Sequence, residues 1–207
     1  MTRQIHLVAF LQAQNCTTIP AAWRHPDARA DFTSAAYYQH IGRVLERGKF
    51  DIGFFDDRLA MPDMYMDDHA HVIEHGIRAV KMDPTAVLMA MGMATERLGL
   101  GATYSTTYHQ PFHVARLFQT LDLMTAGRAA WNVVTSVNDN EARNMGRDRV
   151  IDHDFRYDRA DDFMSAVLGH WDSWDDDAIQ LDKEHGVFAK PGSVRRLDYE
   201  GPYYKTR

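Results

Sequence analysis

The chain has 207 residues, of which 45% are hydrophobic and 11% aromatic, enough for one domain with a substantial core. Its formal net charge is −6 at pH 7, and no basic cluster overrides it, which argues against a nucleic-acid partner. Cys16 is the only cysteine, so an intrachain disulfide is excluded and a reducing compartment is indicated. The sequence shows no signal-peptide pattern and no apolar stretch near the ~20 residues that span a bilayer. We therefore expect a soluble, cytoplasmic protein that is not bound to a membrane.

Apolar runs typical of strands alternate along the chain with segments whose apolar side chains recur at helical spacing. The predicted strands are residues 5–11, 50–56, 98–105 and 129–134, and the predicted helices are 34–48, 83–96, 111–125 and 157–174. Residues 58–82 have no clear period and are expected to form a long excursion over the mouth of the fold. Residues 175–207 are expected to form turns and short antiparallel strands.

The alternation of strands and helices predicts an α/β fold with a parallel sheet. Two architectures satisfy this pattern, a doubly wound open sheet and part of a (β/α)8 barrel. A barrel needs eight units and typically ~250 residues, so this chain would hold only its first half. Periodicity alone does not separate the two.

Polar side chains stand at or just after the ends of the predicted strands, where parallel α/β folds bind ligands. Asp57 follows the second strand, Thr103 and Thr106 lie at the end of the third, and Ser136 follows the fourth. Asn132 lies within the fourth strand, where a buried amide requires a hydrogen-bond partner. Each position also has a plain alternative, because aspartates are common in solvated loops and threonine is a good strand residue.

His153 and Tyr157 are four residues apart at the entry of the last predicted helix. A helix N-terminus favours anions, so this pair is a candidate phosphate site. The alternative is ordinary capping by Asp154 with Tyr157 packed in the core.

Two further signals are weaker. His69 and His71 resemble the paired histidines of some barrel metal sites, but such pairs belong at a strand end, and this pair lies in a Met- and Asp-rich loop. We therefore predict no metal site. Nothing near Cys16 lowers the pKa of its thiol visibly, so a bystander or pocket-lining role is favoured. The common nucleotide-binding and hydrolase motifs are absent from the sequence.

Several segments together resemble the flavin-dependent monooxygenases of the bacterial luciferase-like superfamily. They are WRHPD (23–27), LERGKFDIGFF (45–55), TTYHQPFHVARLFQTLD (106–122), GRAAWNVVTS (127–136), EARNMGRD (141–148) and HDFRYDRADDF (153–163). The closest branch is that of the nitrilotriacetate, pristinamycin and dibenzothiophene-sulfone monooxygenases, with long-chain alkane monooxygenase a near relative. The resemblance implies a (β/α)8 TIM barrel, of which residues 1–174 are four βα units and residues 175–207 begin a β-rich excursion.

The resemblance also implies a cofactor, partners and site residues. Members use reduced FMN (FMNH2), supplied by a separate NAD(P)H:flavin reductase, together with O2. The positions that match the family's flavin contacts are Asp57, Thr103, Thr106, Ser136, His153 and Tyr157. Asn132 is added on physical grounds as a supporting amide. Sulfone-oxidising relatives carry histidines in the loop before WRH, where this chain has Thr18 and Pro20, so the oxygen-handling residue is not identified.

The expected function is therefore a two-component monooxygenase that oxidises a small organic substrate of sulfur, nitrogen or hydrocarbon type. A homo-oligomer is expected, because half a barrel exposes two sheet edges. Two alternatives stay open: a non-catalytic flavin-binding truncated protein, and a metal-dependent barrel hydrolase that uses His69 and His71.

Overall fold

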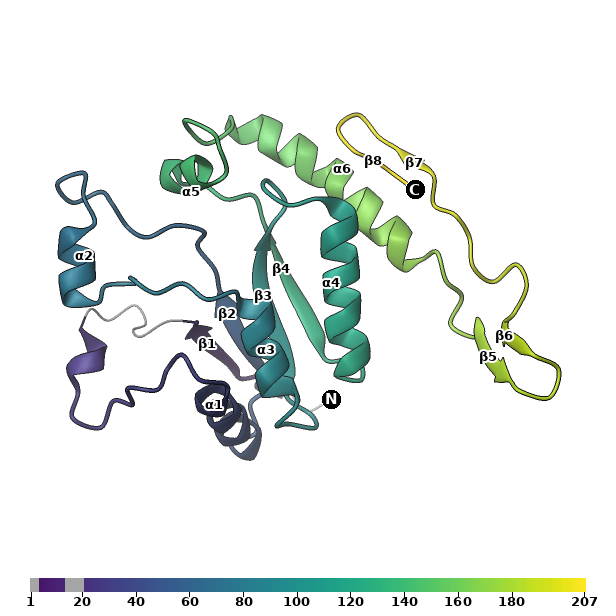
Figure 1. Ribbon diagram of the computed structural model, residues 1–207, viewed down its shortest axis with the longest axis horizontal. Coiled ribbons are helices and arrows are strands. Elements are labelled where there is room, and N and C mark those ends of the chain that lie inside the picture. Colours follow the sequence, from purple (N-terminus) through teal and green to yellow (C-terminus); the bar gives the residue numbers. More distant parts are fainter. Residues whose placement is uncertain (1–3, 14–20) are drawn as a thin grey trace. The chain divides into compact units, whose positions relative to one another are not determined.

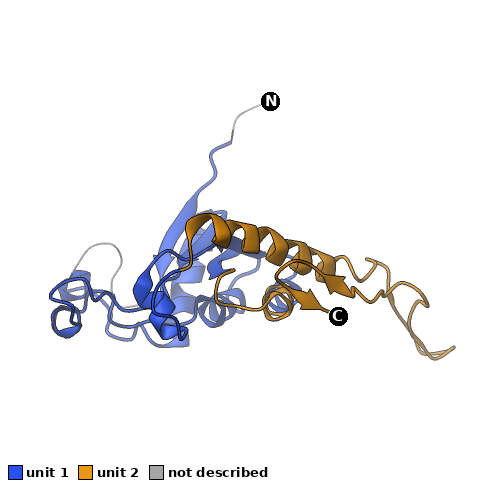
Figure 2. Cartoon of the chain, turned by 90° about the horizontal axis from the view of Figure 1, so that it is seen from above, with its two compact units in different colours: residues 1–105, 120–150 blue, residues 106–119, 151–207 orange. Residues whose placement is uncertain are grey.

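The computed structural model describes residues 4–13 and 21–207 (Figure 1). Cys16, Thr18 and Pro20 lie outside the described residues. The chain divides into two compact units (Figure 2). Unit 1 comprises residues 1–105 and 120–150, and unit 2 comprises residues 106–119 and 151–207.

Unit 1 is built on a parallel sheet of four strands in the order β1-β2-β3-β4 (Figure 1). The strands are β1 Val8–Gln12, β2 Ile52–Asp56, β3 Gly99–Ser105 and β4 Ala129–Val134. The parallel sheet and all four predicted strands are confirmed. β1 begins later than predicted because the N–H of Leu7 donates to the Asp51 carboxylate, at 2.7 Å, rather than to a neighbouring strand.

Two helices of unit 1 begin at caps that the sequence displays. α1 (Ala35–Arg47) starts where the Ser34 side chain accepts a hydrogen bond from the N–H of Tyr37, at 3.2 Å. α3 (Pro84–Gly92) starts at Asp83, whose carboxylate accepts from the N–H of Thr85. α3 ends four residues before the predicted Glu96, where the Arg128 guanidinium binds the carbonyl groups of Gly92, the last residue of the helix, and of Thr95.

The core of unit 1 lies between the sheet and this helical layer. Phe55, Leu88, Met91 and Leu100 are fully buried, and the Phe55 ring packs against Tyr38 of α1 with centroids 6.0 Å apart. Gly92 allows α3 to approach closely, since a Cβ there would lie 2.8 Å from the Thr125 side chain.

The face of the sheet opposite Phe55 carries the neighbouring rings of Phe10 and Phe54, with centroids 5.8 Å apart. The expectation that the Asn132 amide is buried within the fourth strand is wrong for this structure. β4 pairs only with β3 among the described strands, so it is an edge, and Asn132 and Val133 are exposed.

The sequence does not predict three short helices. They are the 3-10 helix η1 (Ala22–Arg24), α2 (Ala70–His75) within the 58–82 excursion, and α5 (Asp139–Asn144) after β4. Two of them have only six residues, which is too short for a helical period to emerge.

Unit 2 is organised around α6 (His153–Trp171), which begins four residues before the predicted start at 157. Short antiparallel strands follow, as predicted: β5 (Ile179–Asp182) pairs with β6 (Val187–Ala189), and β7 (Tyr199–Glu200) pairs with β8 (Lys205–Thr206). α4 (Pro111–Met124) has residues 111–119 in unit 2 and the rest in unit 1. Among the helices that the structure describes, none has the length and apolar character needed to cross a bilayer.

Candidate functional site

The carboxyl end of the sheet in unit 1 carries polar side chains that bond across neighbouring strands. Gln12 Nε2 donates to Asp56 Oδ2 at 2.9 Å, which joins β1 to β2. Asn132 Nδ2 donates to Thr103 Oγ1 at 3.1 Å, which joins β4 to β3. The structure thus brings together two of the polar groups expected there, Thr103 and Asn132.

The polar side chains at the carboxyl ends of the strands form a polar rim, and Ser136 extends this rim beyond β4. Its hydroxyl donates to Ser105 Oγ at 2.9 Å, and its backbone is left-handed, with φ of 46°. A non-glycine residue in this region is uncommon and costs conformational energy, and such residues are concentrated at functional sites. The bend directs the Ser136 hydroxyl back toward the end of β3.

Asp57 contributes to a cleft of about 860 Å³ that is lined entirely by unit 1. Burial raises the pKa of Asp57 to about 6, against the opposing effect of the Lys81 ammonium group and with a further upward contribution from Asp83. A carboxyl group that titrates this close to neutrality in a cleft is a functional-site candidate.

Tyr104 interacts electrostatically with Asp57 and Asp83, and it was not among the site residues predicted from the sequence. Burial and the carboxylates of Asp83 and Asp57 raise the pKa of the Tyr104 hydroxyl to about 12. Burial also lowers the pKa of Lys81, although its neighbouring carboxylates oppose the shift. The register of β2 and β3 explains the proximity, because Phe55 pairs with Ala102 and a continuation by two residues brings Asp57 beside Tyr104.

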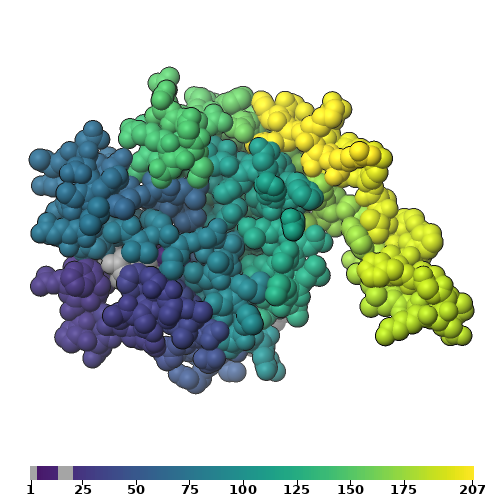
Figure 3. Space-filling view, in the orientation of Figure 1, coloured from purple at the N-terminus to yellow at the C-terminus, as the bar shows by residue number. Residues whose placement is uncertain are grey.

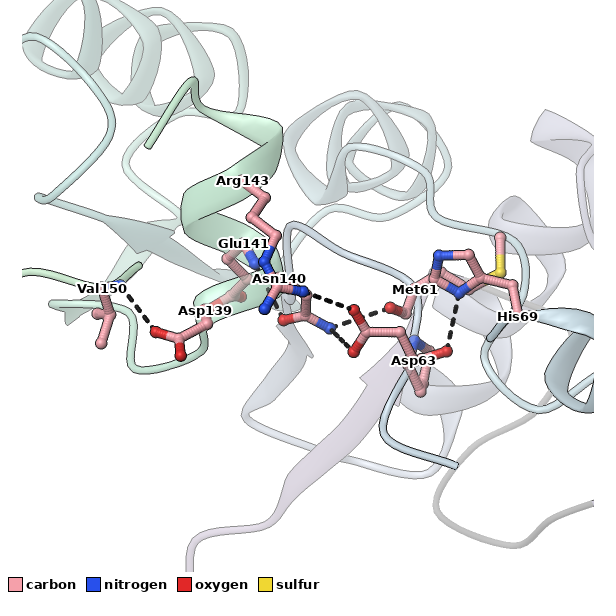
Figure 4. Close-up of polar contacts among 9 residues, drawn as sticks. Met61, Asp63, His69, Asp139, Asn140, Glu141, Arg143 and Val150 are labelled. Atoms are coloured by element: carbon pink, nitrogen blue, oxygen red, sulfur yellow. Dashed lines mark hydrogen bonds and ion pairs between the residues drawn. The ribbon is translucent and has the colours of Figure 1, made fainter. Parts of the chain in front are cut away.

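One wall of the cleft is α5, and the other is the segment that follows Asp57 (Figure 3). The atoms of the 58–82 excursion, blue in Figure 3, lie beside the green atoms of α5. A second hollow of about 500 Å³ continues along the same two walls. Figure 4 shows the polar contacts between them.

The two histidines of the weak metal signal have other contacts. His69 Nδ1 lies 3.0 Å from the carbonyl oxygen of Pro62, and the His71 ring lies 4.3 Å from the His75 ring and 4.9 Å from the Tyr65 ring. Within residues 4–13 and 21–207, no three His, Cys, Asp or Glu side chains are grouped so that they would hold a metal ion.

In unit 2, His153 and Tyr157 occupy the first two turns of α6. Their rings are 4.9 Å apart, and His153 Nδ1 lies 2.8 Å from Asp154 Oδ1. The helix is capped by Asp152, whose carboxylate accepts from the N–H groups of Asp154 and Phe155, so capping by Asp154 is wrong. Core packing of Tyr157 is also wrong, because its side chain is 53% exposed. Both rings therefore stand accessible at the positive end of a 19-residue helix.

Thr106 is the sixth predicted site residue. It is the first residue after β3, lies in unit 2 and is buried, and its carbonyl oxygen accepts from the Tyr204 hydroxyl at 3.5 Å. The predicted set is thus divided, with Asp57, Thr103 and Ser136 in unit 1 and the others in unit 2.

Comparison with known proteins identifies the family. The model of the luciferase-like monooxygenases matches residues 17–207, which is most of the chain. The chain belongs to the luciferase-like monooxygenase family. This confirms the resemblance drawn from the sequence motifs.

Individual members of the luciferase-like family align along nearly the whole chain. A dibenzothiophene-sulfone monooxygenase of Rhodococcus erythropolis (strain XP) is 52% identical over 206 residues, which cover 99% of this chain and 46% of the relative. The long-chain alkane monooxygenase of Geobacillus thermodenitrificans is 35% identical over 100% of this chain and 47% of the relative. The chain spans about half the length of the curated relatives it matches.

Solved structures of the family share the fold. The crystal structure of a long-chain alkane monooxygenase superposes with a TM-score of 0.93 at 33% identity, over 99% of this chain and 48% of that one. A riboflavin lyase with modified FMN and its substrate riboflavin superposes with a TM-score of 0.91 at 34% identity, over 99% of this chain and 46% of that one. These matches confirm the α/β fold of luciferase-like TIM-barrel enzymes.

Proposed function

We propose that this chain is the flavin-binding part of a two-component monooxygenase that uses reduced FMN and O2 to oxidise a small organic substrate. The observation that carries the proposal is the polar rim at the carboxyl ends of β2, β3 and β4, where Asp57, Thr103 and Ser136 stand. Sequence identity of 52% to a dibenzothiophene-sulfone monooxygenase supports this reaction class.

The residues present fit FMN. The isoalloxazine ring system is flat, with hydrogen-bonding groups at one edge, and the hydroxyls of Thr103 and Ser136 and the carboxyl of Asp57 are suitable partners for them. In unit 2, taken by itself, the N-terminus of α6 with His153 and Tyr157 is suited to an anion such as a phosphate group. When bound, the reduced flavin supplies the electrons that activate O2.

The role of the protein in this proposal is to place the flavin and to exclude water from the site. The few polar groups at the strand ends would fix the orientation of the flavin. Asp57 holds a proton at its carboxyl group up to about pH 6, so it accepts or donates a hydrogen bond to the ring edge according to pH.

We propose that the whole protein acts on a substrate of sulfur, nitrogen or hydrocarbon type, because its relatives include monooxygenases named for dibenzothiophene sulfone, dimethyl sulfide, nitrilotriacetate and long-chain alkanes. An NAD(P)H:flavin reductase would deliver the reduced flavin. Assembly as a homo-oligomer is part of the same proposal.

The test is turnover by the full-length protein with FMN, NADH, a flavin reductase, O2 and dibenzothiophene sulfone. Product formation that exceeds hydrogen peroxide leakage supports the proposal. Tight FMN binding with no product from any of the three substrate classes favours a non-catalytic flavin-binding protein. Stoichiometric zinc or manganese in the purified protein favours a metal-dependent hydrolase.

The site assignment has its own test. Asp57→Ala and Tyr157→Phe should each weaken binding of reduced FMN, measured anaerobically by flavin absorbance or fluorescence. If both variants bind reduced FMN like the parent, the assignment is wrong even where turnover is observed.

A further inference from the structure

The EARNMGRD segment, at residues 141–148, has no role in the proposed reaction, yet its helix makes a set of specific contacts. α5 holds the backbone of Leu59 at both polar groups of that residue. The N–H of Leu59 donates to Glu141 Oε1 at 2.9 Å, and Asn144 Nδ2 donates to the carbonyl oxygen of Leu59 at 2.8 Å. Glu141 is only 3% exposed, so its carboxylate is largely removed from water and relies on such hydrogen bonds.

A second pair of α5 side chains, those of Asn140 and Arg143, binds Met61 and Asp63, which follow Leu59 in the same segment (Figure 4). Asn140 Nδ2 donates to the carbonyl oxygen of Met61 at 3.0 Å and to Asp63 Oδ1 at 3.2 Å. Arg143 Nη1 lies 3.3 Å from Asp63 Oδ2. The Asn140 amide is itself oriented, because its oxygen accepts from the N–H of Glu141 at 2.9 Å.

The spacing of the α5 side chains explains how a six-residue helix makes all these contacts. Residues 140 and 143, like residues 141 and 144, are three apart and so share a face of α5. Their targets are the backbone N–H and carbonyl groups of Leu59, the carbonyl oxygen of Met61 and the carboxylate of Asp63. α5 therefore contacts the 59–63 segment along its length, although about 80 positions separate the two in the sequence.

Asp57 stands two residues before the first clamped residue and lines the same cleft as Asn140, Arg143 and Asn144. We propose that α5 is a clamp that fixes the 59–63 segment and thereby sets the position of the Asp57 carboxyl group, with Glu141 and Asn144 as positioning residues. The effect of the clamp on flavin binding rests on the proposed function, but its effect on Asp57 does not.

Three variants of the full-length protein test the clamp. Asn144→Leu keeps the side-chain volume but removes the donor to Leu59. Glu141→Gln is the conservative variant, because an amide oxygen still accepts from the Leu59 N–H. Arg147→Gln is the matched control, since Arg147 is exposed and lies beyond the end of α5. Asp56, Lys81 and Asp83, the charged groups that face Asp57, are unchanged in all three.

The readouts are amide hydrogen exchange at Leu59, the titration midpoint of the Asp57 carboxyl carbon by NMR, and the Kd for reduced FMN. In Asn144→Leu the Leu59 N–H keeps its bond to Glu141, but the segment loses its bond at the Leu59 carbonyl group and opens more often. We therefore expect amide exchange at Leu59 to be about tenfold faster and the Kd for reduced FMN to rise about tenfold, the loss that follows from one hydrogen bond. We expect the Asp57 midpoint to fall toward about 4, the value of a solvated carboxyl. Glu141→Gln and Arg147→Gln should stay close to the parent.

The outcomes separate the two ideas. Faster exchange at Leu59 with an unchanged Asp57 midpoint would show that α5 merely braces the loop, and would overturn the positioning role. A parent protein that binds no reduced FMN would overturn the proposed function, whereas the Asp57 midpoint would still decide the clamp. Equal effects of Asn144→Leu and Arg147→Gln would also count against it.

Discussion

Asp57 weakens the fold whenever its carboxyl group is ionised. The unfolded carboxyl titrates near about 4, whereas the folded one titrates at about 6, so between these values the folded chain binds more protons. Stability contributed by this group is therefore lost as pH rises through that window. Asp57→Asn carries no charge and should remove the loss. We expect the variant to resemble the parent at pH 4 and to be more stable by about 2 kcal/mol at pH 8.

Urea unfolding of Asp57→Asn and the parent across pH 4–8 measures this difference. Glu46→Gln is a suitable control, because three backbone N–H groups lower the pKa of Glu46 although burial opposes them. The Glu46 carboxylate stabilises the fold above its unfolded pKa, and this effect is lost on acidification. The pH dependence of its contribution therefore has the opposite sign to that of Asp57. A parent stability curve that Asp57→Asn does not alter would show that Asp57 is well solvated.

Arg128 stabilises unit 1 through all three nitrogens of its guanidinium group. It donates to the carbonyl groups of Thr125, Leu98, Gly92 and Thr95 and to the Thr95 hydroxyl, at 2.7–3.0 Å. A lysine ammonium lacks this planar fork and leaves several partly buried carbonyl groups without a donor. Arg128→Lys should lower the free energy of unfolding by about 3 kcal/mol. Denaturant unfolding checks this, with the exposed Arg116→Lys as control.

At the residue scale, the sequence predicted the polar groups at strand ends better than it predicted the residues with which they interact. Thr103, Asn132 and Ser136 could be located because each lies within or just after an apolar run that is typical of a strand. Tyr104 and the α5 side chains were missed, because their roles depend on partners in distant segments. Neither the sequence around Glu141 nor the sequence around Leu59 indicates that these two residues form a hydrogen bond.

One carboxylate of α6 binds the β7–β8 hairpin of unit 2 at three points. Asp162 accepts from the N–H groups of Tyr203 and Tyr204, each at 2.8 Å, and from the Tyr199 hydroxyl. An asparagine retains one oxygen acceptor and places an amide donor against these donors. Asp162→Asn should therefore speed hydrogen exchange at residues 203 and 204 by about tenfold or more, with exchange in the sheet unchanged.

Asp161→Asn is the matched control, since Asp161 is exposed on the same helix. Equal exchange in the two variants would mean that the hairpin is held by its aromatic contacts instead, such as Phe163 with Tyr204.

At the element scale, helix starts were predicted more accurately than helix ends. Ser34 and Asp83 cap their helices through bonds two or three residues away, which a local pattern displays. The carbonyl groups at the end of α3 bind Arg128, which lies more than 30 residues further on, and a local pattern does not display this contact. α2 and α5 are stabilised by tertiary contacts rather than by a period of their own.

At the scale of the whole molecule, the order of strands and helices was enough to predict a parallel sheet, but not its closure. An open sheet and half a barrel have the same local pattern, and only the family resemblance separated them. The comparisons resolve the ambiguity, because full-length relatives of about twice this length share the fold over the matched half.

The sheet of unit 1 has a free edge at each side among the described strands. Among the described strands, β1 and β4 each pair on one side only, and Val8 and Phe10 of β1 are 53% and 52% exposed. An apolar edge strand with unpaired backbone groups is a template for association. Residues 1–207 expressed alone should therefore self-associate at micromolar concentrations, and Phe10→Lys should shift them toward monomer, because a charge at an edge opposes pairing. Sedimentation velocity measures this. Phe188→Lys, which places the same charge on the exposed β6 strand of unit 2, should leave association unchanged; if it has the same effect as Phe10→Lys, the contact is not made by the β1 edge.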